Sequence, residues 1–308
     1  MFACRIFRIK NFVLSLILII GIGTCSDAQD FDKAQIRTEK VRGNIFLLTG
    51  PGGNIGVSAG EESVLLIDDE YAPLTDKLKA AIAVISNKPV QFVINTHWHQ
   101  DHTGGNGNLR QAGATIVAHE NVRKRLSTEQ VVEAFKMTIP PSPKVALPVI
   151  TFTQDMTFHL NGDEIYIFHP ESAHTDGDAI IYFRKSNVIH LGDLFFNGMY
   201  PFIDISAGGS IDGMITAVDR VLQICNAETK VIPGHGVVSD KAGLEGYRKM
   251  LVTVRDRIAR QIKEGKTIGE VVASQPTQDF DPALGGGFLK PELFIQIVYS
   301  SLIKKGKN

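Results

Sequence analysis

Cysteine is scarce in this chain. Only three of the 308 residues are cysteines, namely Cys4, Cys25 and Cys225. Because Cys4 and Cys25 fall in or at the edge of an N-terminal apolar segment, Cys225 stands alone in the rest of the chain, which excludes an internal disulfide in a mature form. Cys225 belongs to a run with apolar residues at helical spacing, Ile211–Ala227, and we expect a buried structural thiol.

An excess of charge of one sign is also missing. Thirty-two lysines and arginines oppose 33 aspartates and glutamates, a formal net charge of -1. Proteins whose main partner is a nucleic acid or an anionic membrane carry a basic surface. We therefore expect a small-molecule substrate and no nucleic-acid partner. Repeats, low-complexity tracts and long linkers are absent as well, which predicts one domain over residues 29–308.

The longest apolar run is too short to cross a membrane. It extends from Phe12 to Ile22, whereas a membrane-spanning helix needs about 20 residues. Basic residues precede it and small residues follow it, which is the pattern of a signal peptide. We therefore predict cleavage after Ala28, which removes the signal peptide, residues 1–28. The mature protein would be periplasmic or secreted, without stable membrane insertion.

An alternative reading of the same segment is a lipoprotein signal. The residues Ile22-Gly23-Thr24-Cys25 have the form of a lipid-attachment box, which would anchor the chain through Cys25. Threonine is a poor residue immediately before such a cysteine, so cleavage after Ala28 is the preferred prediction.

After residue 30, short runs typical of strands alternate with helical ones. The longest helical stripe repeats every three to four residues from Leu244 to Ile262, and Pro73–Ser86 also reads as a helix. Four prolines exclude regular structure over residues 137–150, where we expect a loop or lid. The expected strands are Asn44–Thr49, Ile55–Ala59, Val64–Asp68, Val90–Thr96, Thr115–Ala118, Thr151–His159, Glu164–His169, Ala179–Arg184, Asn187–Leu191 and Lys230–Ile232.

The stretch HWHQDHTGG, residues 97–105, places three histidines and an aspartate within six residues at the end of the strand Val90–Thr96. If the extended backbone continues, its period of two directs His97, His99 and Asp101 to one side. His102 would then reach the same place from the turn that the following glycines allow. Imidazole and carboxylate ligands at this spacing favour a divalent metal such as zinc, with a position left for water.

This pattern resembles the HxHxDH signature of the metallo-β-lactamase superfamily, matched by His97, His99, Asp101 and His102. The resemblance continues over most of the chain. His174 in SAHTDGD (172–178), Asp193 in VIHLGD (188–193) and His235 in VIPGHG (231–236) stand where the family has its other ligands. It implies one metal held by His97, His99 and His174, another by Asp101, His102 and His235, and Asp193 bridging them.

The fold implied by the resemblance is α/β, a four-layer αββα sandwich with two zinc ions at the sheet edge. The implied activity is hydrolysis of a carbonyl ester, thioester, lactone or amide by a hydroxide shared between the metals, with Asp101 orienting this nucleophile. The cation held by His97, His99 and His174 would polarise the carbonyl oxygen, and the other would receive the leaving group.

Two other activities stay open on the same residues. β-Lactam hydrolysis is favoured by the export signal, but the position of Asp193 is typically Cys or Ser in true β-lactamases of this superfamily. An iron-containing oxidoreductase or dioxygenase is the other alternative, because a His/Asp ligand set also suits iron. The segment after Asp193 has no Lys or Arg up to residue 204 and is rich in aromatic residues, which suggests an apolar wall beside the metals: Phe195, Phe196, Tyr200 and Phe202.

The remaining histidines, which lie in or beside strands, are expected to be structural: His119, His159, His169 and His190. His119 or His169 would be the exceptions if either supports the metal ligands. The apolar C-terminal run Leu293–Ile303 is expected to pack on its own domain or on a partner, and the oligomeric state stays open.

Overall fold

The computed structural model describes Met1 and residues 31–305. The proposed signal segment, Met1–Ala28, and the cysteines Cys4 and Cys25 therefore lie outside the described residues apart from Met1. Among the described residues, no helix combines the length and the apolar character needed to cross a bilayer.

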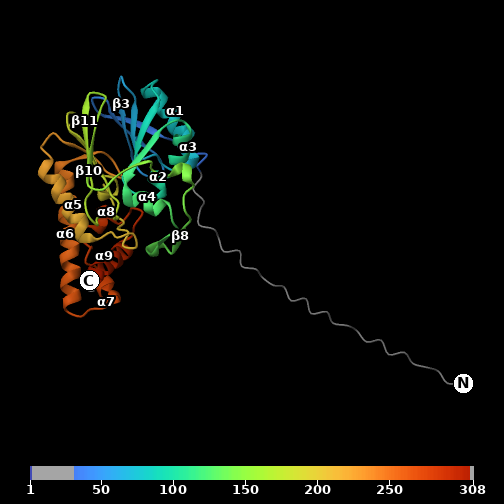
Figure 1. Ribbon diagram of the computed structural model, residues 1–308. Helices are drawn as coiled ribbons and strands as arrows, with labels where there is room; N and C mark the ends of the chain where they lie inside the picture. The colour runs from blue at the N-terminus through green and yellow to red at the C-terminus, as the bar shows by residue number, and fades with distance from the viewer. Residues whose placement is uncertain (2–30, 306–308) are drawn as a thin grey trace.

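Two mixed β-sheets face each other and helices cover both outer faces (Figure 1). The first sheet has seven strands in the order β1-β2-β3-β4-β5-β6-β9, antiparallel up to β4 and parallel from β4 onward. Its strands are β1 (Arg37–Arg42), β2 (Ile45–Thr49), β3 (Ile55–Ala59), β4 (Val64–Ile67), β5 (Val90–Ile94), β6 (Thr115–His119) and β9 (Ile150–Phe152).

The second sheet has six strands in chain order, β10 to β15, antiparallel except for the parallel pair β13–β14. Its strands are β10 (Asp155–Leu160), β11 (Asp163–Phe168), β12 (Ile180–Phe183), β13 (Val188–His190), β14 (Lys230–Ile232) and β15 (Ser239–Asp240). A separate hairpin is formed by β7 (Gln130–Val132) and β8 (Met137–Ile139), and the 3-10 turn η2 (Glu133–Phe135) lies at its tip.

Helices α1 and α3 lie on one flank of the molecule, and α5 and α6 on the other (Figure 1). The α-helices are α1 (Thr75–Ile85), α2 (Gln100–Thr103), α3 (Asn106–Gln111), α4 (Glu120–Leu126), α5 (Ile211–Ile224), α6 (Lys241–Lys263), α7 (Ile268–Ala273), α8 (Asp281–Leu284) and α9 (Pro291–Lys305). Three further 3-10 turns among the described residues connect these elements: η1 (Ala72–Leu74), η3 (Lys144–Ala146) and η4 (Gly192–Leu194), which carries a candidate site residue.

Alternation along the strands explains the four layers. Leu65 and Ile67 point between the sheets, where they join Ile165 and Ile181, while Leu66 of the same strand packs under α1 and α3. A third cluster joins the outer face of the second sheet to α4, α5, α6 and α9. Each sheet thus buries both of its faces, as the nearly unbroken apolar sequence of β4 requires.

The parallel strands determine where a functional site can form. The carboxyl ends of β4 and β5 meet at one edge of the first sheet, and those of β13 and β14 meet at one edge of the second. The β11–β12 connection reaches the same edge as β13 and β14, because β12 runs antiparallel to β13. Loops from both sheets therefore converge on one side of the sandwich.

The α/β sandwich predicted from the sequence is confirmed. The expected helix Pro73–Ser86 corresponds to α1, the stripe Leu244–Ile262 lies within α6, and the C-terminal run lies within α9, which packs on this same domain. Cys225 is free and buried at the end of α5, as expected.

The expected strand Thr151–His159 is wrong in one respect. Its residues belong to two strands in different sheets, β9 and β10, and the chain crosses between the sheets at Thr153 and Gln154. Thr153 accepts a hydrogen bond from His119 through its carbonyl, and Gln154 accepts one from the backbone N–H of His169. These long-range partners satisfy the backbone at the crossover, and no local sequence pattern reveals them.

Two further expectations fail for reasons of composition. The strand β1 is absent from the expected strands because its sequence, RTEKVR, is polar. In the structure it is mostly exposed and forms the edge of the sheet by pairing with β2. Regular structure also enters residues 137–150, where none was expected: Met137–Ile139 forms β8, Lys144–Ala146 forms a 3-10 turn between prolines, and Ile150 begins β9.

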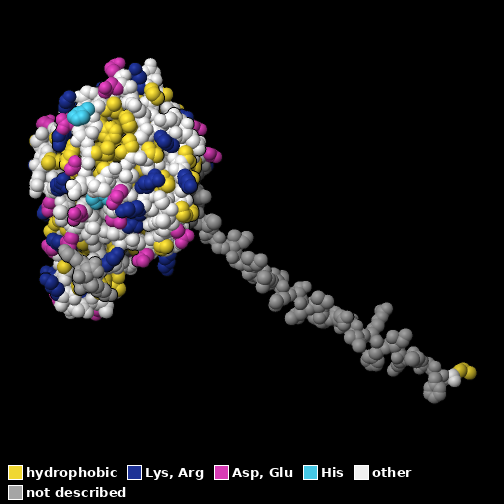
Figure 2. Space-filling model, in the orientation of Figure 1, with side chains coloured by type: hydrophobic (Ala, Val, Ile, Leu, Met, Phe, Trp, Pro, Cys, Tyr) yellow, Lys and Arg dark blue, Asp and Glu magenta, His cyan; other side chains and the backbone are white. Residues whose placement is uncertain are grey.

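On the face shown in Figure 2, basic and acidic side chains are interspersed, without a large area of one sign. His159 is exposed on β10, so the expectation of a structural role for it is wrong, whereas His190 is fully buried on β13.

Two substitutions in the second sheet test this description of the core. Ile167→Ala removes a fully buried side chain between the sheets, and we expect a loss of about 2–5 kcal/mol in unfolding free energy. His159→Ala is the matched control on the neighbouring strand and should change stability by no more than about 0.5 kcal/mol. Denaturant titration measures both, and a large effect of His159→Ala would contradict its exposed placement.

Candidate metal centre

All seven candidate ligands meet at this edge of the sandwich. His97 and His99 follow β5, Asp101 and His102 lie in α2, His174 lies in the β11–β12 connection, Asp193 lies in η4 after β13, and His235 follows β14. Their ligand atoms form two groups, His97–His99–His174–Asp193 and Asp101–His102–His235. Within each group the atoms lie within 4.8 Å of one another.

The backbone reaches this arrangement differently from the sequence expectation. The strand β5 ends at Ile94, residues 96–98 bend, and His99, with φ -63° and ψ 150°, precedes α2, which begins at Gln100. His97 and His99 share one group, as expected, but the helical turn moves Asp101 into the other group with His102. The expectation that Asp101 shares a face with His97 and His99 is therefore wrong.

Hydrogen bonds on the far side of each ring fix which nitrogen faces the first group. His97 Nδ1 donates to Thr96 Oγ1 at 3.0 Å, and His174 Nδ1 donates to the Phe202 carbonyl at 2.9 Å. His99 is turned the other way, because its Nε2 donates to Asp204 Oδ2 at 3.0 Å. The unprotonated nitrogens left over are His97 Nε2, His174 Nε2 and His99 Nδ1.

These three nitrogens point at one another. His99 Nδ1 lies 3.0 Å from both His97 Nε2 and His174 Nε2. If each ring carries its proton on the nitrogen that faces its outer partner, no proton remains to form hydrogen bonds across these short distances. Three lone pairs then converge. A cation bound by the imidazoles satisfies such an arrangement, so the residues fit a divalent metal ion.

The second group is organised in the same way around carboxylates. His102 Nδ1 donates to Asp68 Oδ2 at 2.8 Å, which turns its Nε2 inward to 3.5 Å from Asp101 Oδ2. His235 Nε2 lies 3.4 Å from the same aspartate oxygen. His102 Nε2 and Asp193 Oδ1 are buried without a hydrogen-bond partner, which is costly unless an ion or a proton joins them.

Asp193 faces both groups with different oxygens. Its Oδ2 lies 3.8 Å from His97 Nε2 and 3.6 Å from His174 Nε2. Its Oδ1 lies 3.1 Å from His102 Nε2 and 3.4 Å from His235 Nε2. One carboxylate therefore stands between two sets of nitrogen ligands.

The two groups differ in their electrostatics. Burial lowers the pKa of His97, and it lowers the pKa of His174 to about 4, so both rings stay neutral at physiological pH. At His235 burial acts in the same direction, but Asp193 and Asp101 outweigh it and raise the pKa to about 10. His102 is raised for the same reason, by Asp193, Asp101 and Asp68. The second group thus favours positive charge.

Glycines allow the ligands to pack against the backbone. A Cβ on Gly53 would overlap the His102 ring, and a Cβ on Gly234 would overlap Asp193 Oδ1. The loop between β2 and β3 and the loop after β14 can therefore approach the two groups closely only with glycine at these positions.

Two supporting aspartates were missed by the sequence reading. Asp68 accepts hydrogen bonds from the backbone and hydroxyl of Thr96 as well as from His102. It ends an apolar strand at the same sheet edge as His97, which is a usable signal. Asp204 gives no such signal, because it lies 105 positions from His99. Burial opposes ionisation of Asp204, but the hydrogen bond from His99 outweighs it and lowers the pKa.

The other histidines lie away from the ligand atoms or behind them. His119 stacks on His169 at 3.9 Å between ring centroids, and His169 Nδ1 donates to the Asp178 carbonyl. The Asp178 carboxylate in turn accepts the backbone N–H of His174, so His169 adjoins the support of one candidate ligand. His190 accepts the Gly192 N–H beneath the site.

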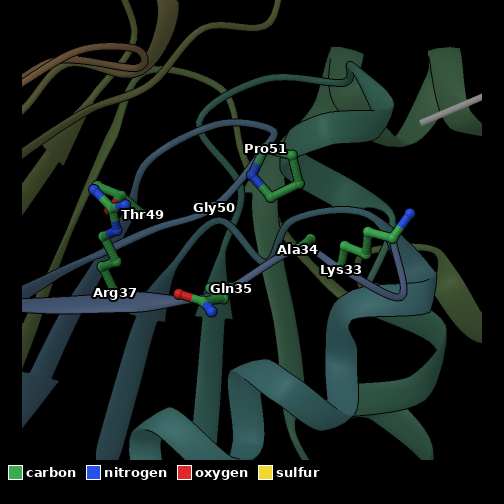
Figure 3. Close-up of a pocket in the computed structure, with 7 residues that line it drawn as sticks. All are labelled: Lys33, Ala34, Gln35, Arg37, Thr49, Gly50 and Pro51. Carbon is green, nitrogen blue, oxygen red and sulfur yellow. The ribbon is translucent and has the colours of Figure 1, made fainter. Parts of the chain in front are cut away.

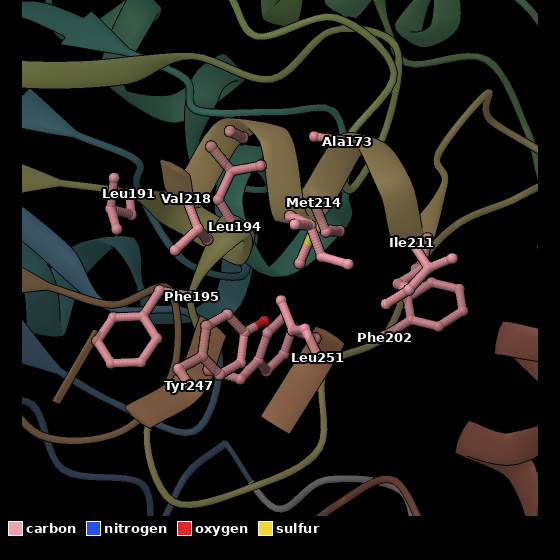
Figure 4. Packing of buried hydrophobic residues seen from close by; sticks show 14 of the residues in the cluster. Ala173, Leu191, Leu194, Phe195, Phe202, Ile211, Met214, Val218, Tyr247 and Leu251 are labelled. Carbon is pink, nitrogen blue, oxygen red and sulfur yellow. The ribbon is translucent and has the colours of Figure 1, made fainter. Parts of the chain in front are cut away.

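The expected apolar wall is divided. Phe195 lies in the core beside Tyr247 (Figure 4), with ring centroids 5.0 Å apart. Tyr200 donates a hydrogen bond to Asp281 and stacks on Phe294. Phe202 lies apart from Phe195 and contacts the rings of His99 and His174, and Phe196 stacks on His235. Phe196 and Phe202 therefore border the metal centre.

An open cavity of about 390 Å³ lies elsewhere, lined by Lys33, Ala34, Gln35, Arg37, Thr49, Gly50 and Pro51 (Figure 3). It contains none of the candidate ligands. Lys33 and Arg37 lie on opposite sides of the view in Figure 3, so they do not present a pair of cations to one anion.

Asp204→Asn tests the support of His99. The amide cannot hold the ring as an ionised carboxylate does, and we expect metal affinity to fall about 10- to 100-fold while the fold persists. Asp155→Asn, which alters an exposed carboxylate on β10, should leave affinity unchanged. Competition with a chromophoric chelator measures both, and equal affinities would show that Asp204 does not orient His99.

The pKa shifts predict which group loses a cation first on acidification. Protons compete most strongly where the pKa is raised, at His102 and His235, and least at His97 and His174, so the second group should empty at higher pH than the first. If each group holds an ion, metal-loaded protein dialysed between pH 8 and pH 4 should lose its metal in two steps, followed by atomic absorption. In His235→Ala the step at higher pH should disappear; loss of the step at lower pH instead would reverse the assignment.

Comparisons with known proteins agree with this geometry. The α subunit of 2,4-dinitroanisole O-demethylase from Nocardioides sp. (strain JS1661) is 24% identical over 164 residues, 52% of this chain, which spans 47% of that subunit. A type 2 metallo-beta-lactamase from Bacillus sp. (strain 170) is 24% identical over 220 residues, covering 71% of this chain and 79% of the relative. The solved metallo-beta-lactamase from Pontibacter korlensis superposes with a TM-score of 0.58 at 22% identity, covering 70% of this chain and 99% of that one.

A family model also matches residues 44–249, which include every candidate ligand. With the αββα sandwich and the His/Asp metal-binding cluster at its edge, this match shows that the chain belongs to the metallo-beta-lactamase superfamily.

Proposed function

We propose that the protein is a zinc-dependent hydrolase with two metal ions, which cleaves a carbonyl ester, thioester, lactone or amide. The observation that carries this proposal is the position of Asp193, whose two oxygens face different nitrogen groups. A carboxylate so placed neutralises part of the repulsion between two cations and fixes their separation. Three imidazoles on one side, and two imidazoles with Asp101 on the other, suit zinc.

Two zinc ions held there supply a hydroxide nucleophile near neutral pH and an electrophile for a carbonyl oxygen. The chain's own residues then orient the reactants. Asp101, whose Oδ2 faces His102 and His235, is placed to orient the nucleophile. Asp204 and Asp68 keep His99 and His102 in the tautomers that leave their inner nitrogens free.

Export of the protein is part of the proposal. It rests on the succession of basic, apolar and small residues in Met1–Ala28. In a bacterial host, fractionation of the full-length chain should recover a periplasmic or secreted form that begins after Ala28. Recovery of a cytosolic protein that retains Met1–Ala28 would refute export.

β-Lactam hydrolysis is the second candidate, and the similarity to type 2 metallo-beta-lactamases favours testing it. Against it stands Asp193, which faces both groups where the true β-lactamases that the sequence resembles typically carry Cys or Ser. A third reading, iron-based oxidation, is separated from hydrolysis by the metal that the purified protein contains.

Asp193→Ala provides the decisive test. Wild-type protein should contain about two equivalents of zinc, and the variant should lose about one equivalent and most of its turnover, because the shared carboxylate is gone. Elemental analysis, melting temperature and turnover of a panel of esters, thioesters, lactones and β-lactams are the measurements. His159→Ala is the control and should retain both zinc and activity.

Each proposed element can fail separately. Stoichiometric iron without zinc would refute the zinc hydrolase. If Asp193→Ala kept both ions and near-normal turnover, the bridging role would be wrong and β-lactam hydrolysis would become the leading candidate. A folded variant that has lost one zinc and its turnover supports the proposal.

A further inference from the structure

A row of three phenylalanine rings leads away from the first ligand group. Phe202 lies 5.7 Å from the His99 ring and 5.8 Å from the His174 ring, measured between centroids. Phe135 follows at 4.8 Å from Phe202, and Phe288 at 5.5 Å from Phe135. We call Phe202, Phe135 and Phe288 the aromatic row.

Exposure increases along the aromatic row. Phe202 is 7% exposed, Phe135 is half-buried, and Phe288 is 72% exposed. An aromatic side chain left in water at the end of such a row forgoes the stabilisation that burial would give. Its free face is therefore a surface on which an apolar ligand group gains stability.

The outer ring is held in place from both sides. At Gly287 a Cβ would come within 2.5 Å of the Met199 Cβ, so this segment packs closely on Met199. Leu289, on the other side of Phe288, is 1% exposed. Lys290 Nζ donates to the Gly287 carbonyl at 3.1 Å. Phe288 is thus an exposed ring between two anchored neighbours.

The middle ring is anchored through the hairpin β7–β8. Val132 and Ile139 of this hairpin are buried, and the Glu133 N–H donates to Ser206 Oγ at 3.3 Å. Phe135 lies in η2 at the tip. Phe288 lies beyond residue 249, where the family match ends, so the outer part of the row is a feature of this chain rather than of the matched region.

We propose that the aromatic row is a substrate-binding subsite for a phenyl or similarly bulky apolar group on the acyl side of the scissile bond. The acyl side is assigned because Phe202 contacts His99 and His174. These histidines would hold the cation that polarises the carbonyl oxygen. This assignment rests on the proposed hydrolase function, whereas the binding of an apolar group does not. Aromatic rings pair favourably at centroid distances of about 4.5–7 Å, the spacing that the row already shows.

Binding of two carboxylates to zinc-loaded protein tests the subsite without turnover. Propanoate and 3-phenylpropanoate share the carboxylate and differ by a phenyl group, so their affinity ratio reports the aromatic contact alone. By calorimetry we expect 3-phenylpropanoate to bind about tenfold more tightly in the wild type. In Phe288→Ala and Phe135→Ala the ratio should fall to about threefold or less.

Val131→Ala is the matched control. Val131 is 50% exposed and pairs with the exposed Thr138 on the solvent face of the same hairpin, so the ratio should stay at its wild-type value. Zinc content and melting temperature, measured for every variant, identify any loss of fold. The proposal is overturned if the wild type shows no phenyl preference or no binding, or if Phe288→Ala retains the preference.

The two proposals fail in different ways. A phenyl preference that depends on Phe288, in a protein that hydrolyses no substrate of the panel, would uphold the binding of an apolar group and refute the hydrolase together with the acyl-side assignment. Ester hydrolysis without any phenyl preference would uphold the hydrolase and refute the subsite.

Discussion

The convergence of unprotonated nitrogens on one point is the constraint on which the rest of the site depends. His99 Nδ1 stands 3.0 Å from two other ring nitrogens, and Asp193 adds a negative charge beside them. Without a proton or a cation between them, such lone pairs repel. The ring positions persist because partners behind each ring, a carbonyl, a hydroxyl or a carboxylate, are themselves buried and hydrogen-bonded.

The sandwich supplies the stability that this arrangement lacks. Each ligand loop starts at the end of a strand whose last two residues are buried, as in β5, β11, β13 and β14. The parallel pairs β4–β5 and β13–β14 place the ends of distant segments side by side. The ligands therefore lie in loops and short helical turns that begin from fixed positions at the strand ends, which accounts for a precise site.

The sequence predicts the part of this site that is encoded locally. His97, His99, Asp101 and His102 fall within six residues, and the other ligands each follow a recognisable apolar strand or a family pattern. Edge strands and crossovers between sheets are harder to predict from the sequence. The strand β1 is polar, and the break between β9 and β10 depends on hydrogen-bond partners far along the chain. The expected extended conformation of Asp101 is wrong because the short helix α2 has no apolar periodicity from which it could be predicted.

The residues that a single sequence does not reveal are those joined only in three dimensions. Asp204 orients His99 through Oδ2, while its Oδ1 accepts the hydroxyl of Ser206 at 2.6 Å, and Ser206 accepts the backbone N–H of Glu133. The hairpin that carries Phe135 is therefore hydrogen-bonded, in two steps, to the carboxylate that orients a candidate metal ligand. If the aromatic row binds substrate as proposed, a substitution that shifts the tip of this hairpin is expected to alter the support of His99 as well.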